Sequence, residues 1–167
     1  KKEEIKELSV LVVGLGNKDV TPDALGPYVI ANLDVTRHIF MLKNNHGRSK
    51  GISAMIPGVM AQSGMESAEM VEGIAKQIKP DVVICIDALA AGSTKRLSST
   101  IQLADTGIKP GAGIGNRRKG IDKENLGIPV IAIGIPTVIH AATIVSDTMD
   151  EIIKVLSELP DMKGNGG

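Results

Sequence analysis

Two aspartates, Asp23 and Asp87, occupy positions where acid–base chemistry is commonly found. Asp87 directly follows a short apolar run at residues 81–86, and Asp23 comes soon after a similar run at residues 8–13. If the two carboxyl groups approach closely, they cannot both ionise freely, and one of them keeps a proton. The ionised group can then activate water while the protonated group polarises a carbonyl or protonates a leaving amine.

His140 is a third candidate, because it follows another apolar run at residues 130–135, past Pro136. Each candidate also has an ordinary structural role. Asp23 can begin a helix, Asp87 can bond backbone amides in a loop, and a lone histidine more often faces solvent than binds a ligand. The pattern alone leaves these alternatives open.

Apolar periodicity predicts the elements that position these residues. The three runs are short and rich in β-branched residues, as buried strands are, and two shorter strands are predicted at residues 53–56 and 100–103. Amphipathic helices are predicted over residues 24–33, from the capping-box spacing at 63–66 to Pro80, and over 141–156. This alternation predicts an α/β fold, a three-layer α/β/α sandwich with a mostly parallel sheet.

We expect this sandwich to form a single domain over residues 1–167, with residues 161–167 disordered. Parallel strands present their carboxyl ends at one edge of a sheet, and sites collect beyond that edge. Asp23, Asp87 and His140 are therefore expected to lie there together.

Composition narrows the classes of partner and environment. Lys+Arg and Asp+Glu are equal at 19 each and aromatic residues make up 1%, which argues against direct nucleic-acid binding. The single cysteine, Cys85, allows neither an internal disulfide nor a cysteine-based zinc site, and its position within a strand predicts an inert thiol. No apolar run has the length of a membrane span, so a cytoplasmic location is expected.

Several familiar motifs are incomplete. Gly14-Leu15-Gly16 begins like a dinucleotide fingerprint, but Asp19 stands where the third glycine is required. The triplet Asp105-Thr106-Gly107 occurs in aspartic proteases, which bring two copies together in an all-β fold. One copy in an α/β pattern favours a turn. The glycine-rich loop at 111–116, followed by basic residues 117–119, suits an anion cradle but more often forms a solvated loop.

Longer motifs run through almost the whole chain, from about residue 11 to residue 153. They lie at residues 13–17, 20–27, 36–38, 57–60, 86–91, 105–116 and 126–134. Their order and content resemble the germination proteases of spore-forming bacteria. The resemblance implies an endopeptidase that degrades small acid-soluble spore proteins at germination, with a fold similar to the hydrogenase-maturation endopeptidases.

The same resemblance carries implications for the site and the assembly. The two essential aspartates of the family fall on Asp23 and Asp87, so no cofactor is expected. The family is made as a longer zymogen that processes itself and forms a homotetramer in the cytoplasm of the spore core. The substrate normally accompanies DNA, yet nothing in this sequence indicates DNA binding by the chain itself. The sequence is expected to be a fragment of a longer zymogen or a trimmed relative.

Two departures from the family pattern keep other hypotheses open. Gly92 stands where the family usually has arginine, and His140 stands where it usually has aspartate. The related hydrogenase-maturation enzymes hold a metal with two acids and a histidine, so Asp23, Asp87 and His140 could bind a divalent metal such as zinc or nickel. Alternatively, the departures favour an inactive binding or assembly module.

Overall fold

The computed structural model describes residues 8–43, 50–111 and 119–158. Within these residues, five strands form one sheet in the order β2-β1-β3-β5-β4. The strands are β1 Ser9–Gly14, β2 Gly51–Met55, β3 Val82–Ala91, β4 Gln102–Ala104 and β5 Val130–Ile139. The first three and β5 are mutually parallel, and β4 pairs antiparallel with β5 at one edge. The predicted mostly parallel α/β fold is confirmed.

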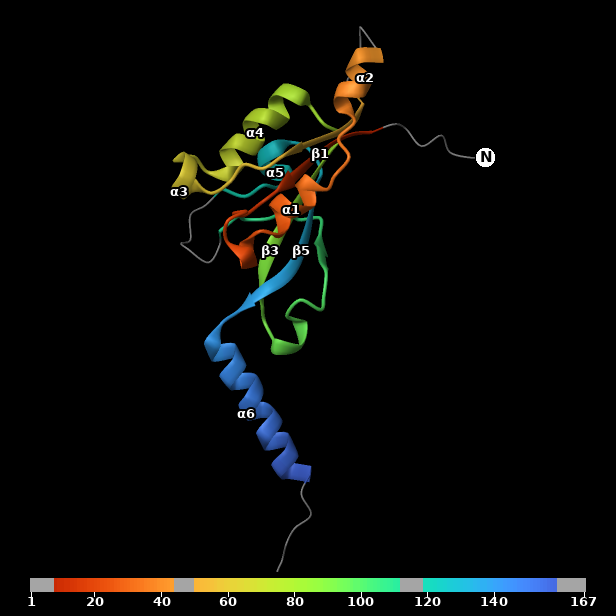
Figure 1. The fold of residues 1–167 in the computed structure, drawn as a ribbon. Coiled ribbons are helices and arrows are strands. Elements are labelled where there is room, and N and C mark those ends of the chain that lie inside the picture. The colour runs from red at the N-terminus through yellow and green to blue at the C-terminus, as the bar shows by residue number, and fades with distance from the viewer. Residues whose placement is uncertain (1–7, 44–49, 112–118, 159–167) are drawn as a thin grey trace, which may run out of the picture.

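Helices cover both faces of this sheet (Figure 1). The described helices are α1 Leu25–Ala31, α2 Arg37–Lys43, α3 Met60–Ser63, α4 Ser67–Ile78, α5 Lys123–Leu126 and α6 Ala141–Glu158, with two short 3-10 turns, η1 Thr21–Asp23 and η2 Thr94–Arg96. Alternate residues of β1 and β3, including Val13 and Cys85, pack with Val71 of α4 in the main core. On the opposite face, Gly14 of β1 lies directly against Gly26 of α1. The alternation of side chains along each strand thus produces the predicted layers.

Two strands are longer than the sequence predicted. β3 continues past residue 86 to Ala91, and β5 continues past Pro136 to Ile139, because the two extensions pair with each other. The Pro136 carbonyl accepts a hydrogen bond from Ser98 N at 2.7 Å, on the side of β5 away from β3. The N–H that proline lacks would lie on that same side, beyond the end of the β4–β5 ladder. Pro136 is therefore tolerated, because no ladder hydrogen bond is lost.

The helix predicted to start from the capping-box spacing at residues 63–66 starts three residues later, with Glu66 as its cap. Ser63 ends α3, and Gly64 follows it in a left-handed conformation with φ 72°. The capping bond begins at Glu66 instead, whose N–H donates to Glu69 Oε2 at 3.0 Å. The reason is that Ser63, which the pattern assigned to the cap, is instead the last residue of the short helix α3.

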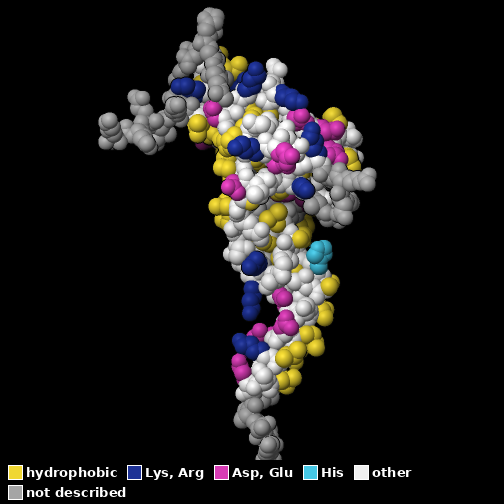
Figure 2. Space-filling view, turned by 180° about the vertical axis from the view of Figure 1, so that it is seen from behind, with side chains coloured by type: hydrophobic (Ala, Val, Ile, Leu, Met, Phe, Trp, Pro, Cys, Tyr) yellow, Lys and Arg dark blue, Asp and Glu magenta, His cyan; other side chains and the backbone are white. Residues whose placement is uncertain are grey.

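The last helix, α6, extends away from the sheet (Figure 1). Its second turn is tied to η2 by Asp147, which accepts hydrogen bonds from Thr94 N at 2.6 Å and Thr94 Oγ1 at 2.8 Å. Figure 2 shows apolar side chains along one side of this helix, and those exposed are Ile144, Val145, Met149, Ile152, Ile153, Val155 and Leu156. Among the described helices, none has the length and apolar character needed to cross a membrane. The disorder predicted for residues 161–167 concerns residues outside the described part.

Candidate active site

Asp23 is held at the carboxyl end of β1 by the loop that leads into α1. Asn17 N donates to Asp23 Oδ2 at 2.8 Å and to the Asp23 carbonyl at 3.1 Å. Gly16 permits this approach, since its φ is +106° and an added Cβ would lie 2.0 Å from the Asp23 carbonyl oxygen. Thr137 Oγ1 of β5 also donates to the carbonyl of Pro22. The carboxyl group of Asp23 is therefore held by the Asn17 amide, and the backbone of its turn is also tied to β5.

Asp87 lies inside β3 and not after it, which corrects the sequence prediction. It comes one residue beyond the last β1–β3 pair, Gly14 with Ile86, and opposite Gly134 of β5. Its Oδ1 accepts a hydrogen bond from the following amide, Ala88 N, at 2.8 Å. Asp87 therefore lies level with the carboxyl end of the neighbouring strand β1, although its own strand, β3, continues beyond it.

The environment of Asp87 favours its protonated form. Burial is the largest cause, the negative charge of Asp23 adds to it, and together they raise the pKa of Asp87 to about 6 despite the opposing hydrogen bond from Ala88. Both aspartates line the same cavity, so the charge of Asp23 opposes ionisation of Asp87. Near pH 6, the pair can therefore hold one proton on Asp87.

The raised pKa of Asp87 predicts a specific pH dependence of stability. The native state binds this proton more tightly than the unfolded chain, so the contribution is full below pH 4 and is lost as the pH rises through about 6. Asp87→Asn has no such titration. Between pH 4 and pH 7 the free energy of unfolding of the original protein should fall relative to the variant by about 2–3 kcal/mol. Urea unfolding of both proteins measures this difference, and parallel pH curves would contradict it.

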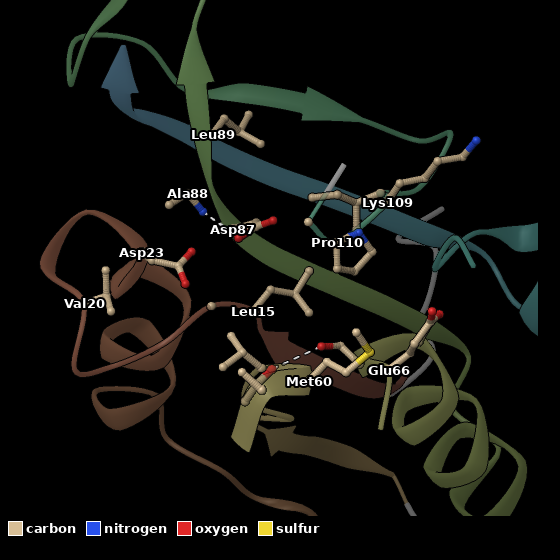
Figure 3. A pocket seen from close by; sticks show the side chains of 18 of the residues that line it. Leu15, Val20, Asp23, Met60, Glu66, Asp87, Ala88, Leu89, Lys109 and Pro110 are labelled. Atoms are coloured by element: carbon tan, nitrogen blue, oxygen red, sulfur yellow. Dashed lines mark hydrogen bonds between the residues drawn. The ribbon is translucent and has the colours of Figure 1, made fainter. Parts of the chain in front are cut away.

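The two aspartates line a cavity of about 860 Å³ (Figure 3). Its walls are largely apolar and come from several elements. The apolar residues are Leu15, Val59, Met60, Ala68, Leu89 and Ile108. Charged residues also line it: Glu66, Lys109 and Lys119, the last paired with Glu72 of α4. A largely apolar cavity with two carboxyl groups suits hydrolysis of a bond in an extended, partly apolar ligand.

These wall residues were not predicted from the sequence. Val59 and Met60 belong to a motif that the resemblance had noted, but nothing in the pattern assigned them to the site. Leu89 could have been predicted to line the site, because it lies two residues after Asp87 and so on the same face of β3. Ala68 lies in the first turn of α4, and Leu15 and Ile108 come from loops, whose paths are not set by periodicity.

His140 does not join the aspartates within this chain. It follows β5 directly and is exposed. It lies three residues beyond Thr137, whose hydroxyl bonds the Pro22 carbonyl, and six residues beyond Gly134, the partner of Asp87. In the described residues, no three His, Cys, Asp or Glu side chains gather closely enough to hold a metal ion. The expectation that His140 shares the edge is therefore wrong, since β5 carries it past the site, and the donor set does not fit a metal.

The other motifs fall into structural roles. Asp105 and Thr106 form a bend after β4, as a turn requires, and Gly107 has φ +83°. Cys85 is completely buried, and burial raises the pKa of its thiol to about 12, as expected of an inert core residue. The predicted glycine-rich loop falls mostly at 112–118, outside the described residues.

Comparison with known proteins decides the relationship. The sequence model of the germination protease family matches residues 1–164. The chain belongs to the germination protease family. It is 56% identical over 151 residues to the germination protease of Bacillus cereus (strain AH187), covering 89% of this chain and 41% of that protein. The germination protease of Bacillus subtilis (strain 168) is 52% identical over 162 residues, with 96% and 44% covered.

The chain thus spans less than half the length of these germination proteases. A solved [NiFe] hydrogenase maturation protease, HycI from Thermococcus kodakarensis KOD1, has a similar fold, with a TM-score of 0.51 at 18% identity over 92% of this chain and 96% of that one. The family and the fold implied by the sequence motifs are therefore both confirmed.

Proposed function

We propose that this germination-protease chain carries the catalytic aspartate pair of an endopeptidase that degrades small acid-soluble spore proteins. One observation supports this most strongly. Asp87, with a pKa raised to about 6, shares a largely apolar cavity with the charged Asp23. A partly buried acid beside a second carboxylate is the arrangement that gives two like groups opposite roles.

The proposed reaction uses water and needs no cofactor. The ionised Asp23 takes a proton from water, and the resulting hydroxide attacks the carbonyl carbon of the scissile peptide bond. Protonated Asp87 donates its proton to the carbonyl oxygen or to the departing amine nitrogen. The products are a carboxylic acid and an amine, and the pair returns to one shared proton after proton exchange with water.

The wider biology belongs to the same proposal. We infer a protein substrate that normally accompanies DNA, no direct contact of this chain with DNA, and no membrane association. The natural protein is inferred to act in the spore core as a homotetramer that arises from a self-processed zymogen. These inferences rest on the family, whose curated members are longer than this chain.

Digestion of a purified small acid-soluble spore protein by the full natural chain tests the function. We expect cleavage into discrete fragments, detected by mass spectrometry, and equal rates with and without a strong chelator. Loss of cleavage on chelation, restored by zinc or nickel, would instead support the metal-dependent hypothesis. Stable binding with no cleavage would support the binding module and would refute the proposed activity.

A further inference from the structure

The strand that carries Asp87 has an open edge beside the cavity. Pairing between β1 and β3 ends at Gly14 with Ile86, whereas β3 continues to Ala91 through its pairing with β5. Within the described ranges, no strand lies on the β1 side of β3 beyond Ile86. An unpaired edge offers backbone donors and acceptors to any extended chain that reaches it.

The hydrogen-bond pattern shows which groups face this edge. Val83 N donates to Pro129 O at 2.9 Å on the β5 side, and Ile86 O accepts from Leu15 N at 2.8 Å on the β1 side. Backbone groups point to alternate sides along a strand, and the extra residue of the register shift beside Ala90 lies in β5, so Ala88 and Ala90 direct their groups to the β1 side. The N–H of Ala88 is engaged by Asp87 Oδ1. The Ala88 carbonyl and the Ala90 amide face the edge beyond the end of β1.

This edge and the aspartates belong to one cavity. Ala88, Leu89 and Ala90 line it together with Asp23 and Asp87. Figure 3 shows Ala88 and Leu89 following Asp87 along the same strand, with Asp23 beside them. A backbone that pairs with this edge therefore passes directly along the carboxyl groups. Its alternate side chains would meet the apolar walls of the cavity.

We propose that an extended segment of the substrate protein binds as an added strand along β3, hydrogen-bonded to the Ala88 carbonyl and the Ala90 amide. This inference rests on the proposed peptidase function and specifies how the peptide is held. Strand addition recognises the main chain, while side chains are read at every second position. The substrate class is therefore an unfolded or locally extended segment, and helical or folded segments are not cut.

A scan of backbone N-methylation tests this from the substrate side. The cleavage site is first mapped in a small acid-soluble spore protein, and a 12-residue peptide spanning it is made with each nitrogen methylated in turn. With the full natural chain, kcat/KM should fall at least tenfold at alternate nitrogens and less than threefold at those between them. A methyl group removes a donor and blocks the edge only where the N–H faces β3. Losses without this alternation would overturn strand addition.

A matched pair of proline substitutions tests it from the enzyme side. Ala90→Pro removes the exposed amide that the substrate would use and should lower kcat/KM about tenfold or more. Leu103→Pro is the control, because Leu103 lies in the edge strand β4, is 71% exposed and directs its amide away from β5. Its kcat/KM should stay within twofold. Equal effects of the two substitutions, with both proteins folded by circular dichroism, would contradict the proposal.

Three further outcomes separate failure of the proposed function from failure of strand addition alone. If the natural chain cleaves neither the spore protein nor the parent peptide, the proposed function fails, and strand addition fails with it. If it cleaves both but shows no alternation, strand addition alone fails. Slow hydrogen exchange of the Ala90 amide in the free protein would show that another segment or a second copy already covers the edge, which would also overturn the proposal.

Discussion

Asp23→Asn and Asp87→Asn are each expected to lower kcat/KM for a small acid-soluble spore protein by about 10²–10⁴-fold. Asparagine keeps the size of aspartate and can still accept the bond that Asn17 N makes to residue 23. It cannot take a proton from water, and it has no proton to give to a leaving amine. Initial rates of fragment formation, with circular dichroism to verify folding, measure the effect.

The two carboxyl groups act as one unit, so their losses should not add. The double variant is expected to have about the same activity as the less active of the two single variants. Asp105→Asn and His140→Ala serve as controls, because both residues lie outside the cavity lining, and each should retain activity within threefold of the original protein. More than a tenth of normal activity in either aspartate variant would refute the pair.

The placement of the aspartates was predictable because it depends on strand order and not on exact strand ends. Asp23 and Asp87 follow or extend β1 and β3, which are adjacent and parallel. Any parallel sheet of these strands would bring their carboxyl ends to one edge. A shift of a residue or two in either boundary leaves this conclusion intact.

His140 was misplaced because its position depends on where β5 ends. Pro136 reads as a strand terminator, yet β5 continues to Ile139 since its partner β3 also continues. The extension of β3 is Asp87 to Ala91, a stretch rich in alanine and with little intrinsic preference for strands. These two extensions stabilise each other, and such a mutual effect cannot be read from either segment alone.

The short helix α5 shows the opposite case, where a local signal existed and was missed. Asp122 caps it, accepting a hydrogen bond from Asn125 N at 2.8 Å, and Gly127 ends it in the left-handed conformation. An acidic cap followed by a glycine stop is a legible pattern. The helix has four residues, so it shows no apolar periodicity by which to recognise it.

Gly16→Ala is expected to lower kcat/KM about 100-fold, although residue 16 carries no reacting group. An added methyl would lie 2.0 Å from the Asp23 carbonyl oxygen, and the φ of +106° is strained for alanine. The loop must therefore move, and Asp23 moves with it. Displacements of about 1 Å in a catalytic group are enough for losses of this size.

Gly73→Ala is the matched control for this substitution. Gly73 lies within α4, and nothing stands within 4 Å of the Cβ that alanine would add. This variant should raise the free energy of unfolding by about 0.5–1 kcal/mol, because alanine favours helix, and should leave kcat/KM unchanged. Gly16→Ala should instead lower the free energy of unfolding by about 1–3 kcal/mol. If Gly16→Ala were as active as Gly73→Ala, the reaction would not depend on the position of Asp23. This result would contradict a catalytic role for the aspartate pair.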